Sequence, residues 1–427
     1  MRVLRHPQQT GELLKSRLEA WRTYETLFRV VERIVEDVRR RGDEALVEYT
    51  RKFDGVDLTE LGIRVSKAEV EEAYEKVPDG FPEAVETLRD RVSQVASKML
   101  ENLKTEVELD GVSIKIEPKP VESAGCYVPG GRASYPSTAV MTSTPAKAAG
   151  VERVVACTPP GEGGSVNPAT LVALDLCGVD EVYRVGGAQA VAAMAYGTET
   201  IKSVRVVVGP GNRYVTAAKM LVSRSVRVDL PAGPSELLVL ADSSADPTLV
   251  ALDIVSQAEH DVDAVCGLVT DSEDLAFRVV KEVERISGSC GRREVVSESL
   301  SKNGFAVVCG SMEEALEFAE EFAPEHLEVH VSNPEDLAGR VRSAGVVLVG
   351  PYAPTAFSDY YAGLNHVLPT GGYAHSYSGL SVLDFVRLVG FVESTPEALR
   401  ESLKVVELLS RVEGLPNHLK SVSGRFG

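Results

Sequence analysis

Seven histidines occur in the sequence, and four of them stand among other side chains that can hold a metal ion or move a proton. The four settings are QAEH at His260, PEHLE at His326, DYYAGLNHVLPT at His366 and EGLPNH at His418. His326 directly follows Glu325, so one loop supplies two groups that can transfer protons near neutral pH. By contrast, His330 in LEVHVSN is typical of a strand residue that faces a neighbouring strand.

A polar stripe marks the helix predicted over residues 247–260. Asp253, Gln257 and His260 follow one another at spacings i, i+4 and i+7, which places them on one face of an otherwise apolar helix. Such a stripe must be satisfied by a bound group or by solvent. Because the positions beside it are also polar, spacing alone leaves both interpretations open.

Two further pairs lie close in sequence. Asp359 and His366 bracket a loop bounded by Gly and Pro, and loops between strands carry function more often than packing. Glu413 and His418 lie near the C-terminus, where a solvated pair is an equally simple interpretation. Zinc takes about four N, O or S ligands, and the sequence contains no HxxH or HExxH pattern. A metal site would therefore have to be assembled from distant segments.

Three predicted strand-to-helix turns carry glycines that would let a backbone approach a phosphate. They lie in CYVPGG (Gly130–Gly131), YRVGGAQ (Gly186–Gly187) and VVVGPGN (Gly209–Gly211). A helix that follows such a turn directs unpaired N–H groups at a pyrophosphate. The full GxGxxG pattern is absent because Tyr214 occupies its third position, and Asp229 is weak support for ribose binding. Tight-turn geometry explains any one of these turns, whereas three in adjacent units make nucleotide binding an equally good explanation.

The order of predicted elements indicates an α/β protein with two Rossmann-like parallel-sheet domains. Short apolar strands that alternate with helices are typical of parallel sheets covered on both faces. The predicted regions are a helical N-terminal region (1–110), a Rossmann-like domain with the glycine turns (111–235), a second Rossmann-like domain with most of the metal and acid–base candidates (236–375), and a helical C-terminal tail (376–427). GLSVLDFVRLV and PEALRESLKVVELLSRVEGL carry the predicted helices of the tail.

Charge and hydropathy exclude several classes of partner. A net charge of −18 argues against nucleic acid and against an anionic membrane surface, because both would repel the chain. No apolar run approaches the roughly 20 residues of a membrane span, and the N-terminus lacks the apolar core of a signal peptide. Six cysteines without a CxxC pair fit a reducing compartment. We therefore expect a cytoplasmic protein that acts on a small molecule.

Seven motifs, in this order along the chain, resemble the hallmarks of the histidinol dehydrogenase family: VGGAQAVAAMAYGT, GPGN-x-YVT-x-AK, AGPSE, SQAEH, APEHLE, GLNHVLPT and EGLPNH. The resemblance covers roughly residues 25–420. It implies an enzyme that uses NAD and Zn²⁺ to oxidise L-histidinol to L-histidine in two steps through an enzyme-held aldehyde, the last step of histidine biosynthesis. It also implies a homodimer in which the C-terminal tail of one chain completes the active site of the other.

The resemblance also implies a role for each matching residue. The implied zinc ligands are Gln257, His260, Asp359 and His418. The implied acid–base residues are Glu325 and His326. The implied NAD contacts are Tyr127, Gln189 and Asn212. The implied substrate contacts are Ser235, Gln257, His260, His326, Asp359, His366, Glu413 and His418. Two positions depart from the family pattern, since Ser358 stands where Gly is common and Ser143 where Asn is expected.

Two other hypotheses compete with histidinol oxidation. One is a related NAD- and zinc-dependent dehydrogenase of another amino alcohol or diol. The other is a nucleotide-binding homologue without catalysis. The full set of implied substrate contacts favours histidinol over another alcohol, and the presence of all four implied zinc ligands argues against a loss of catalysis.

Overall fold

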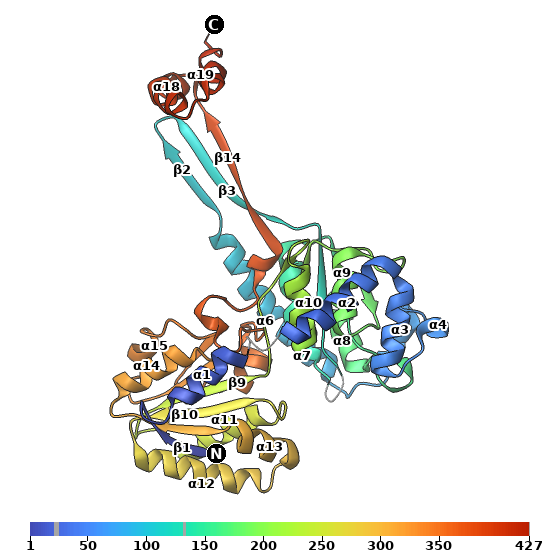
Figure 1. Cartoon of the computed structure of the whole chain (residues 1–427), viewed down its shortest axis with the longest axis vertical. Coiled ribbons are helices and arrows are strands. Elements are labelled where there is room, and N and C mark those ends of the chain that lie inside the picture. Colours follow the sequence, from blue (N-terminus) through green and yellow to red (C-terminus); the bar gives the residue numbers. More distant parts are fainter. Residues whose placement is uncertain (21–24, 131–133, 427) are drawn as a thin grey trace.

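The computed structural model describes residues 1–20, 25–130 and 134–426. Figure 1 shows two lobes and a long arm that projects away from them. The N-terminus lies in one lobe and the C-terminus at the tip of the arm. Each lobe is built on a parallel sheet, and the arm on a three-stranded antiparallel sheet.

The first lobe contains five parallel strands in the order β6-β5-β4-β7-β8. They are β4 (Ser123–Tyr127), β5 (Arg153–Cys157), β6 (Glu181–Tyr183), β7 (Val206–Val208) and β8 (Arg227–Val228). One face packs on α7 (Pro136–Ala149), α8 (Pro168–Leu176) and α6 (Phe81–Asn102). The other face packs on α9 (Gly187–Tyr196), α10 (Arg213–Val222), α2 (Glu25–Arg41) and α3 (Asp43–Asp54). The short helices α4 (Leu58–Leu61) and α5 (Lys67–Tyr74) link these layers.

The second lobe contains six parallel strands in the order β1-β11-β10-β9-β12-β13. They are β1 (Arg2–Arg5), β9 (Glu236–Ala241), β10 (Val265–Thr270), β11 (Phe305–Val308), β12 (His326–His330) and β13 (Val346–Val349). One face packs on α11 (Pro247–Ala258), α12 (Glu273–Ser287) and α13 (Arg293–Asn303). The other packs on α1 (Gly11–Ala20), α14 (Met312–Phe322) and α15 (Pro334–Ala338).

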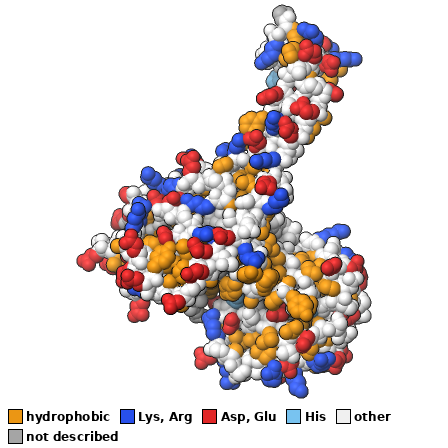
Figure 2. All heavy atoms as spheres, turned by 180° about the vertical axis from the view of Figure 1, so that it is seen from behind, with side chains coloured by type: hydrophobic (Ala, Val, Ile, Leu, Met, Phe, Trp, Pro, Cys, Tyr) orange, Lys and Arg blue, Asp and Glu red, His pale blue; other side chains and the backbone are white. Residues whose placement is uncertain are grey.

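The arm joins segments that are far apart in the sequence. Strand β3 (Val112–Pro120) pairs on one side with β2 (Thr105–Leu109) and on the other, over nine residue pairs, with β14 (Val386–Ser394). Beyond β14, three helices form the tip: α17 (Pro396–Glu401), α18 (Leu403–Val412) and α19 (Pro416–Ser423). Figure 2 shows charged side chains of both signs and hydrophobic side chains along the surface of the arm.

The prediction of an α/β fold with two parallel sheets is confirmed, but two element assignments were wrong. Residues 2–5 are not helical and form the edge strand of the second sheet. FVRLV in the tail supplies strand β14 rather than a helix, and it pairs in the arm with residues 112–120. These strands depend on partners more than 100 residues away, so local periodicity could not reveal them. Helix α13 was not predicted at all.

A buried arginine joins the N-terminal helices to the first sheet. Arg184, 2% exposed, donates to the carbonyl oxygen of Gly164 and to the carboxylate of Glu69 at 2.7 Å. This hydrogen bond is the main cause that lowers the pKa of Glu69 to about 2, against the opposing effect of burial. Glu69 also closes the capping box of α5 with Ser66.

The Glu69–Arg184 pair predicts a pH-dependent stability. Because the pKa of Glu69 is lower in the folded chain than its ordinary 4.5, the pair stabilises the fold above that value. Its contribution is lost as the pH falls towards about 2. Glu69→Gln keeps the cap but loses the charge, so the difference in free energy of unfolding between wild type and variant should shrink from pH 6 to pH 3. Urea unfolding at each pH measures it, and a difference that stays constant would contradict the assignment.

None of the described helices is both long enough and apolar enough to cross a bilayer.

Candidate active site

A cleft of about 1000 Å³ is lined by both lobes. From the first lobe it takes residues that follow the carboxyl ends of β4 and β7, among them Pro129 and Asn212. In the strand order β6-β5-β4-β7-β8, the connection after β4 runs to β5 on one side and the connection after β7 runs to β8 on the other. Open α/β sheets bind ligands at such a switch point. The second lobe contributes the amino ends of its strands, with Ser235 before β9 and Glu325 before β12.

The three predicted NAD contacts gather around two glycine turns. The Tyr127 hydroxyl accepts a hydrogen bond from the backbone N–H of Gly187 at 3.0 Å. Asn212 caps α10, because its Oδ1 accepts from the N–H groups of the first turn at 3.0 and 3.2 Å. Tyr127 and Asn212 line the cleft, whereas Gln189 is buried on α9 beside Gly187 and does not. Gly209 has a φ of +119°, and a Cβ there would lie 2.1 Å from the Tyr127 carbonyl oxygen, so only glycine fits.

Asp229 has a structural role instead of the ribose contact considered from the sequence. Its Oδ1 accepts from Lys219 Nζ at 2.5 Å and its Oδ2 from the Gly209 N–H at 2.7 Å. Lys219 also donates to the carbonyl oxygens of Gly209 and Leu230. Burial raises the pKa of Asp229, and Lys219 opposes that effect. The side chain of Asp229 is fully buried, so the ion pair fixes the turn and leaves the carboxylate no access to a ligand.

Breaking this buried pair should be costly. Lys219→Met leaves a buried carboxylate without its cation, so we expect the free energy of unfolding to fall by about 3–5 kcal/mol. The double variant Lys219→Met/Asp229→Asn removes both charges and should regain part of that loss. Urea unfolding followed by circular dichroism measures both. A loss below about 1 kcal/mol, typical of an exposed pair, would show that the pair is solvated.

Glu325 and His326 sit at the amino end of β12, where the second sheet meets the cleft. Glu325 Oε2 accepts from the N–H of Glu236 at 2.7 Å. His326 Nδ1 lies 3.1 Å from the Glu236 carbonyl oxygen and 3.5 Å from Glu325 Oε2, and its Nε2 lies 3.5 Å from Asp359 Oδ1. The neighbouring strand β9 therefore holds both side chains through its backbone.

The carboxylates around His326 favour the protonated form of its imidazole. Burial lowers the pKa of His326, but the carboxylates of Glu325 and Asp359 outweigh it and raise the pKa well above its ordinary value. Burial raises the pKa of Glu325, and His326 opposes that shift. A buried imidazole and carboxylate whose pKa values are shifted by each other in this way are candidates for acid–base catalysis.

Three of the four implied zinc ligands line the same cleft. Gln257 and His260 come from the end of α11, and Asp359 from the π-helix η3 (Ser358–Ala362). Burial lowers the pKa of His260, and the charge of Asp359 opposes this, so the two side chains lie within electrostatic reach. Asp359 Oδ1 is buried without a hydrogen-bond partner, as are His326 Nε2 and His366 Nδ1. The unpartnered oxygen of Asp359 leaves room for an ion, and carboxylate and imidazole are donor types that zinc accepts.

The remaining implied residues divide between the cleft and the arm. Ser235 and His366 line the cleft, with His366 Nδ1 3.9 Å from Asp359 Oδ1. Glu413 and His418 lie at the tip of the arm, are exposed, and do not line the cleft of their own chain. Within one chain, the cleft therefore contains every metal and substrate candidate except Glu413 and His418.

The two departures from the family pattern are accommodated locally. Ser143 is buried in α7 and donates to the Ala139 carbonyl oxygen at 2.5 Å. Ser358 is buried at the start of η3, and its N–H donates to the Pro354 carbonyl oxygen. Several residues of the cleft wall were not singled out from the sequence, among them Tyr135 and Arg292. Arg292 precedes α13, and the α13 sequence has too weak an amphipathic pattern to predict its position.

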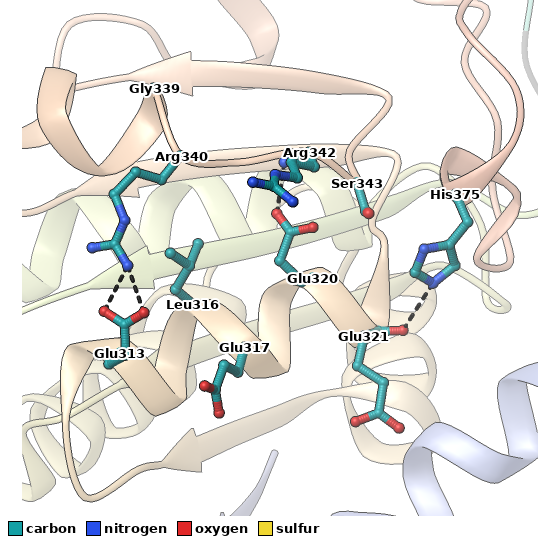
Figure 3. A pocket seen from close by; sticks show the side chains of 10 residues that line it. All are labelled: Glu313, Leu316, Glu317, Glu320, Glu321, Gly339, Arg340, Arg342, Ser343 and His375. Atoms are coloured by element: carbon teal, nitrogen blue, oxygen red, sulfur yellow. Dashed lines mark hydrogen bonds and ion pairs between the residues drawn. The ribbon is translucent and has the colours of Figure 1, made fainter.

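A second hollow, on the surface of the second lobe, has no comparable chemistry. Figure 3 shows it beside α14, lined by Glu313, Leu316, Glu317, Glu320, Glu321, Gly339, Arg340, Arg342, Ser343 and His375. Arg340 is paired with Glu313, and the backbone N–H of Arg342 donates to Glu320. His375 Nε2 lies 3.4 Å from the Glu321 carbonyl oxygen. The polar groups in these contacts are thus hydrogen-bonded or ion-paired with one another.

Fold and cleft together define a two-sheet α/β protein with a cleft at the switch point of one sheet, lined by histidine and carboxylate side chains of the other lobe. Comparison with known proteins makes this specific. The sequence model of the family described as histidinol dehydrogenase matches residues 19–426. The histidinol dehydrogenase of Archaeoglobus fulgidus is 48% identical over 93% of this chain and 95% of its own length. That of Methanopyrus kandleri is 46% identical over 92% and 93%.

A solved structure agrees with these sequence relatives. The crystal structure of histidinol dehydrogenase from Elizabethkingia anophelis superposes with a TM-score of 0.89 at 38% identity, covering 93% of this chain and 92% of that one. The chain belongs to the histidinol dehydrogenase family, which is a family of oxidoreductases.

Proposed function

We propose that this chain oxidises L-histidinol to L-histidine with NAD and Zn²⁺, as the last step of histidine biosynthesis in the cytoplasm. The observation that carries the proposal is the buried Glu325–His326 pair, which lies in one cleft with Gln257, His260 and Asp359. Family membership supports the substrate, and the cleft beside the glycine turns supports NAD.

The chain's own residues supply the proton transfers. In the first oxidation His326 accepts the hydroxyl proton of the alcohol, and its position between two carboxylates stabilises the charge that it gains. In the second, Glu325 removes a proton from the water that attacks the aldehyde, giving the hydrate that is oxidised to the acid. NAD, when bound, accepts a hydride in each step. Zinc, held by Gln257, His260, Asp359 and His418, would orient the substrate and polarise its oxygen.

The position of Glu413 and His418 supports a homodimer with shared active sites. Both lie on the arm tip, away from the cleft of their own chain. The arm also exposes large apolar side chains, including Val392 (68%), Leu409 (58%) and Val412 (86%), and exposed apolar surface of this kind marks an interface. We propose that a second copy of the chain covers this arm, and that His418 and Glu413 enter the cleft of that copy.

A spectrophotometric assay tests the proposed function. With Zn²⁺ and NAD, purified protein should form NADH from L-histidinol in a ratio of about two to one, because the substrate is oxidised twice. A strong chelator should abolish the reaction, and added Zn²⁺ should restore it. Oxidation of another amino alcohol or a diol in place of histidinol would indicate a related dehydrogenase. No NADH from any alcohol would indicate a nucleotide-binding homologue without catalysis.

A further inference from the structure

A second cluster of metal-binding side chains lies one layer below the cleft. Asp253 stands on α11 one turn before Gln257, and Glu328 and His330 follow His326 on β12. Alternate residues of a strand point to the same side, so Glu328 and His330 share the face of His326. Their partners in register on β9, Val239 and Ala241, belong to the apolar layer under α11. The cluster therefore lies between α11 and β12 and shares no residue with the implied zinc ligands.

The geometry of the cluster is that of a metal-binding group. One ligand atom from each of the three side chains lies within 4.8 Å of the others. His330 Nε2 and Glu328 Oε2 are 3.4 Å apart. Among the described residues, this is the group of His and acidic side chains that meets this distance limit.

Two atoms of the cluster have no hydrogen-bond partner. Glu328 is fully buried and His330 is 4% exposed, and both Glu328 Oε2 and His330 Nε2 are unpartnered. The other oxygen, Glu328 Oε1, accepts from the N–H and the hydroxyl of Thr355, each at 2.8 Å. The hydrogen bonds from Thr355 to Oε1 hold the carboxylate in place, and its other oxygen, Oε2, lies close to His330 and Asp253. Unpartnered buried polar atoms are costly, so something must satisfy them.

Charge points to a cation as the missing partner. Two carboxylates face each other here, and within the described part of the chain no lysine or arginine forms an ion pair with either. Burial, then the charge of Glu328 and a side-chain hydrogen bond with it, raise the pKa of Asp253 to about 8, so a bound ion would displace a proton held between the two carboxylates. A divalent ion would neutralise both carboxylates and take the free imidazole nitrogen as a third ligand. Carboxylate and imidazole are ligands that Zn²⁺ accepts.

From this geometry we propose that Asp253, Glu328 and His330 form a second divalent-cation site, separate from the one implied in the cleft. Asp253 is only partly buried, so an ion and a coordinating water can enter from its side. The bound ion would join α11 to β12, and Glu328 extends the connection to Thr355 at the start of α16 (Thr355–Phe357). α11 carries Gln257, β12 carries His326, and α16 leads directly into η3, which carries Asp359. The second ion would therefore fix the elements that position these side chains in the cleft.

Metal counting on the full-length protein tests the proposal without relying on activity. Protein stripped with a chelator is dialysed against Zn²⁺ and its metal content is measured by mass spectrometry. We expect about two ions per chain in the wild type, about one in Glu328→Gln, about one in His260→Ala, and close to none in the double variant. Glu328→Gln keeps the size of the side chain and the Thr355 contacts. His375→Gln, at a histidine outside both clusters, should still bind about two.

An equal ion count in wild type and Glu328→Gln would overturn the proposal, and so would a complete loss of zinc in His260→Ala. Circular dichroism checks the fold of each variant. If Glu328→Gln does not fold, His330→Gln replaces it with the same expected count. The proposed function is judged separately: a wild type that holds one ion and oxidises histidinol overturns only the second site, whereas one that holds two and forms no NADH overturns only the function.

Discussion

Replacing His326 by alanine is expected to lower kcat for histidinol oxidation by about 10²–10⁴-fold, the range that a positioned acid–base group contributes. His326 lies between the carboxylates of Glu325 and Asp359 and is held by the backbone of β9. It is not among the implied zinc ligands, so the variant should keep its metal. Steady-state rates together with zinc content distinguish lost proton transfer from lost metal.

Two matched variants sharpen this result. Glu325→Gln keeps the hydrogen bond from Glu236 but removes the base, so it should oxidise histidinol to the aldehyde faster than it completes the second step. His260→Ala should lose the zinc ion of the cleft as well as activity. If His326→Ala keeps the wild-type kcat, proton transfer occurs elsewhere and the assignment of the pair is wrong.

Replacing His418 by alanine is expected to abolish activity even though this residue is exposed on the arm. If His418 completes the zinc site of a partner chain, its loss leaves three protein ligands and should weaken zinc binding by at least about 10²-fold, since even residues that only support ligands contribute 10–100-fold. Lys420→Ala, on the same exposed helix, is the matched control and should leave zinc affinity unchanged. Isothermal titration with Zn²⁺ measures both. An unaltered affinity in His418→Ala would contradict a shared site.

Much of the two-sheet architecture could be predicted from short apolar runs. VERVVACTPP and ELLVLADSS are strands that are buried on both faces, so their residues are continuously apolar, as expected of parallel strands between helix layers. In the structure Asn212 and Asp246 cap α10 and α11, and residues of these types are common at helix starts. These signals are local in the sequence, and the elements that they indicate are present in the structure.

The arm could not be predicted because its strands are specified by distant partners. Val386–Ser394 is mostly exposed and gains its conformation from pairing with Val112–Pro120, nearly 300 residues earlier in the chain. Its sequence, VRLVGFVES, continues an apolar pattern that also suits a helix. Arg2–Arg5 has only four residues, too few to show any period, and becomes a strand because β11 offers an open edge.

For the site, the sequence named candidate residues, several of which the structure brings to one cleft, but it could not show how each side chain packs. Asp253 and Gln257 lie on α11 as predicted, whereas the helix ends at Ala258 and His260 lies in the turn beyond it. Spacing also could not show that Gln257 and His260 line the cleft while Asp253 groups with Glu328 and His330. His330 was expected to face a neighbouring strand, and the structure instead places its Nε2 beside Glu328. Gln189 shows the same limit of sequence analysis. The motif named it as an NAD contact, but the motif could not show that the packing of α9 buries its side chain beside Gly187.

Complementation between two inactive variants tests the central claim most directly. His326→Ala has a defective cleft and an intact arm, and His418→Ala has the reverse. In a mixed dimer with exchanged arms, one of the two sites combines an intact cleft with an intact arm. Co-expression of differently tagged chains at equal levels should therefore recover about a quarter of the wild-type NADH formation, since half of the dimers are mixed and each has one complete site. Purified mixed dimers that remain inactive would contradict an active site shared between two chains.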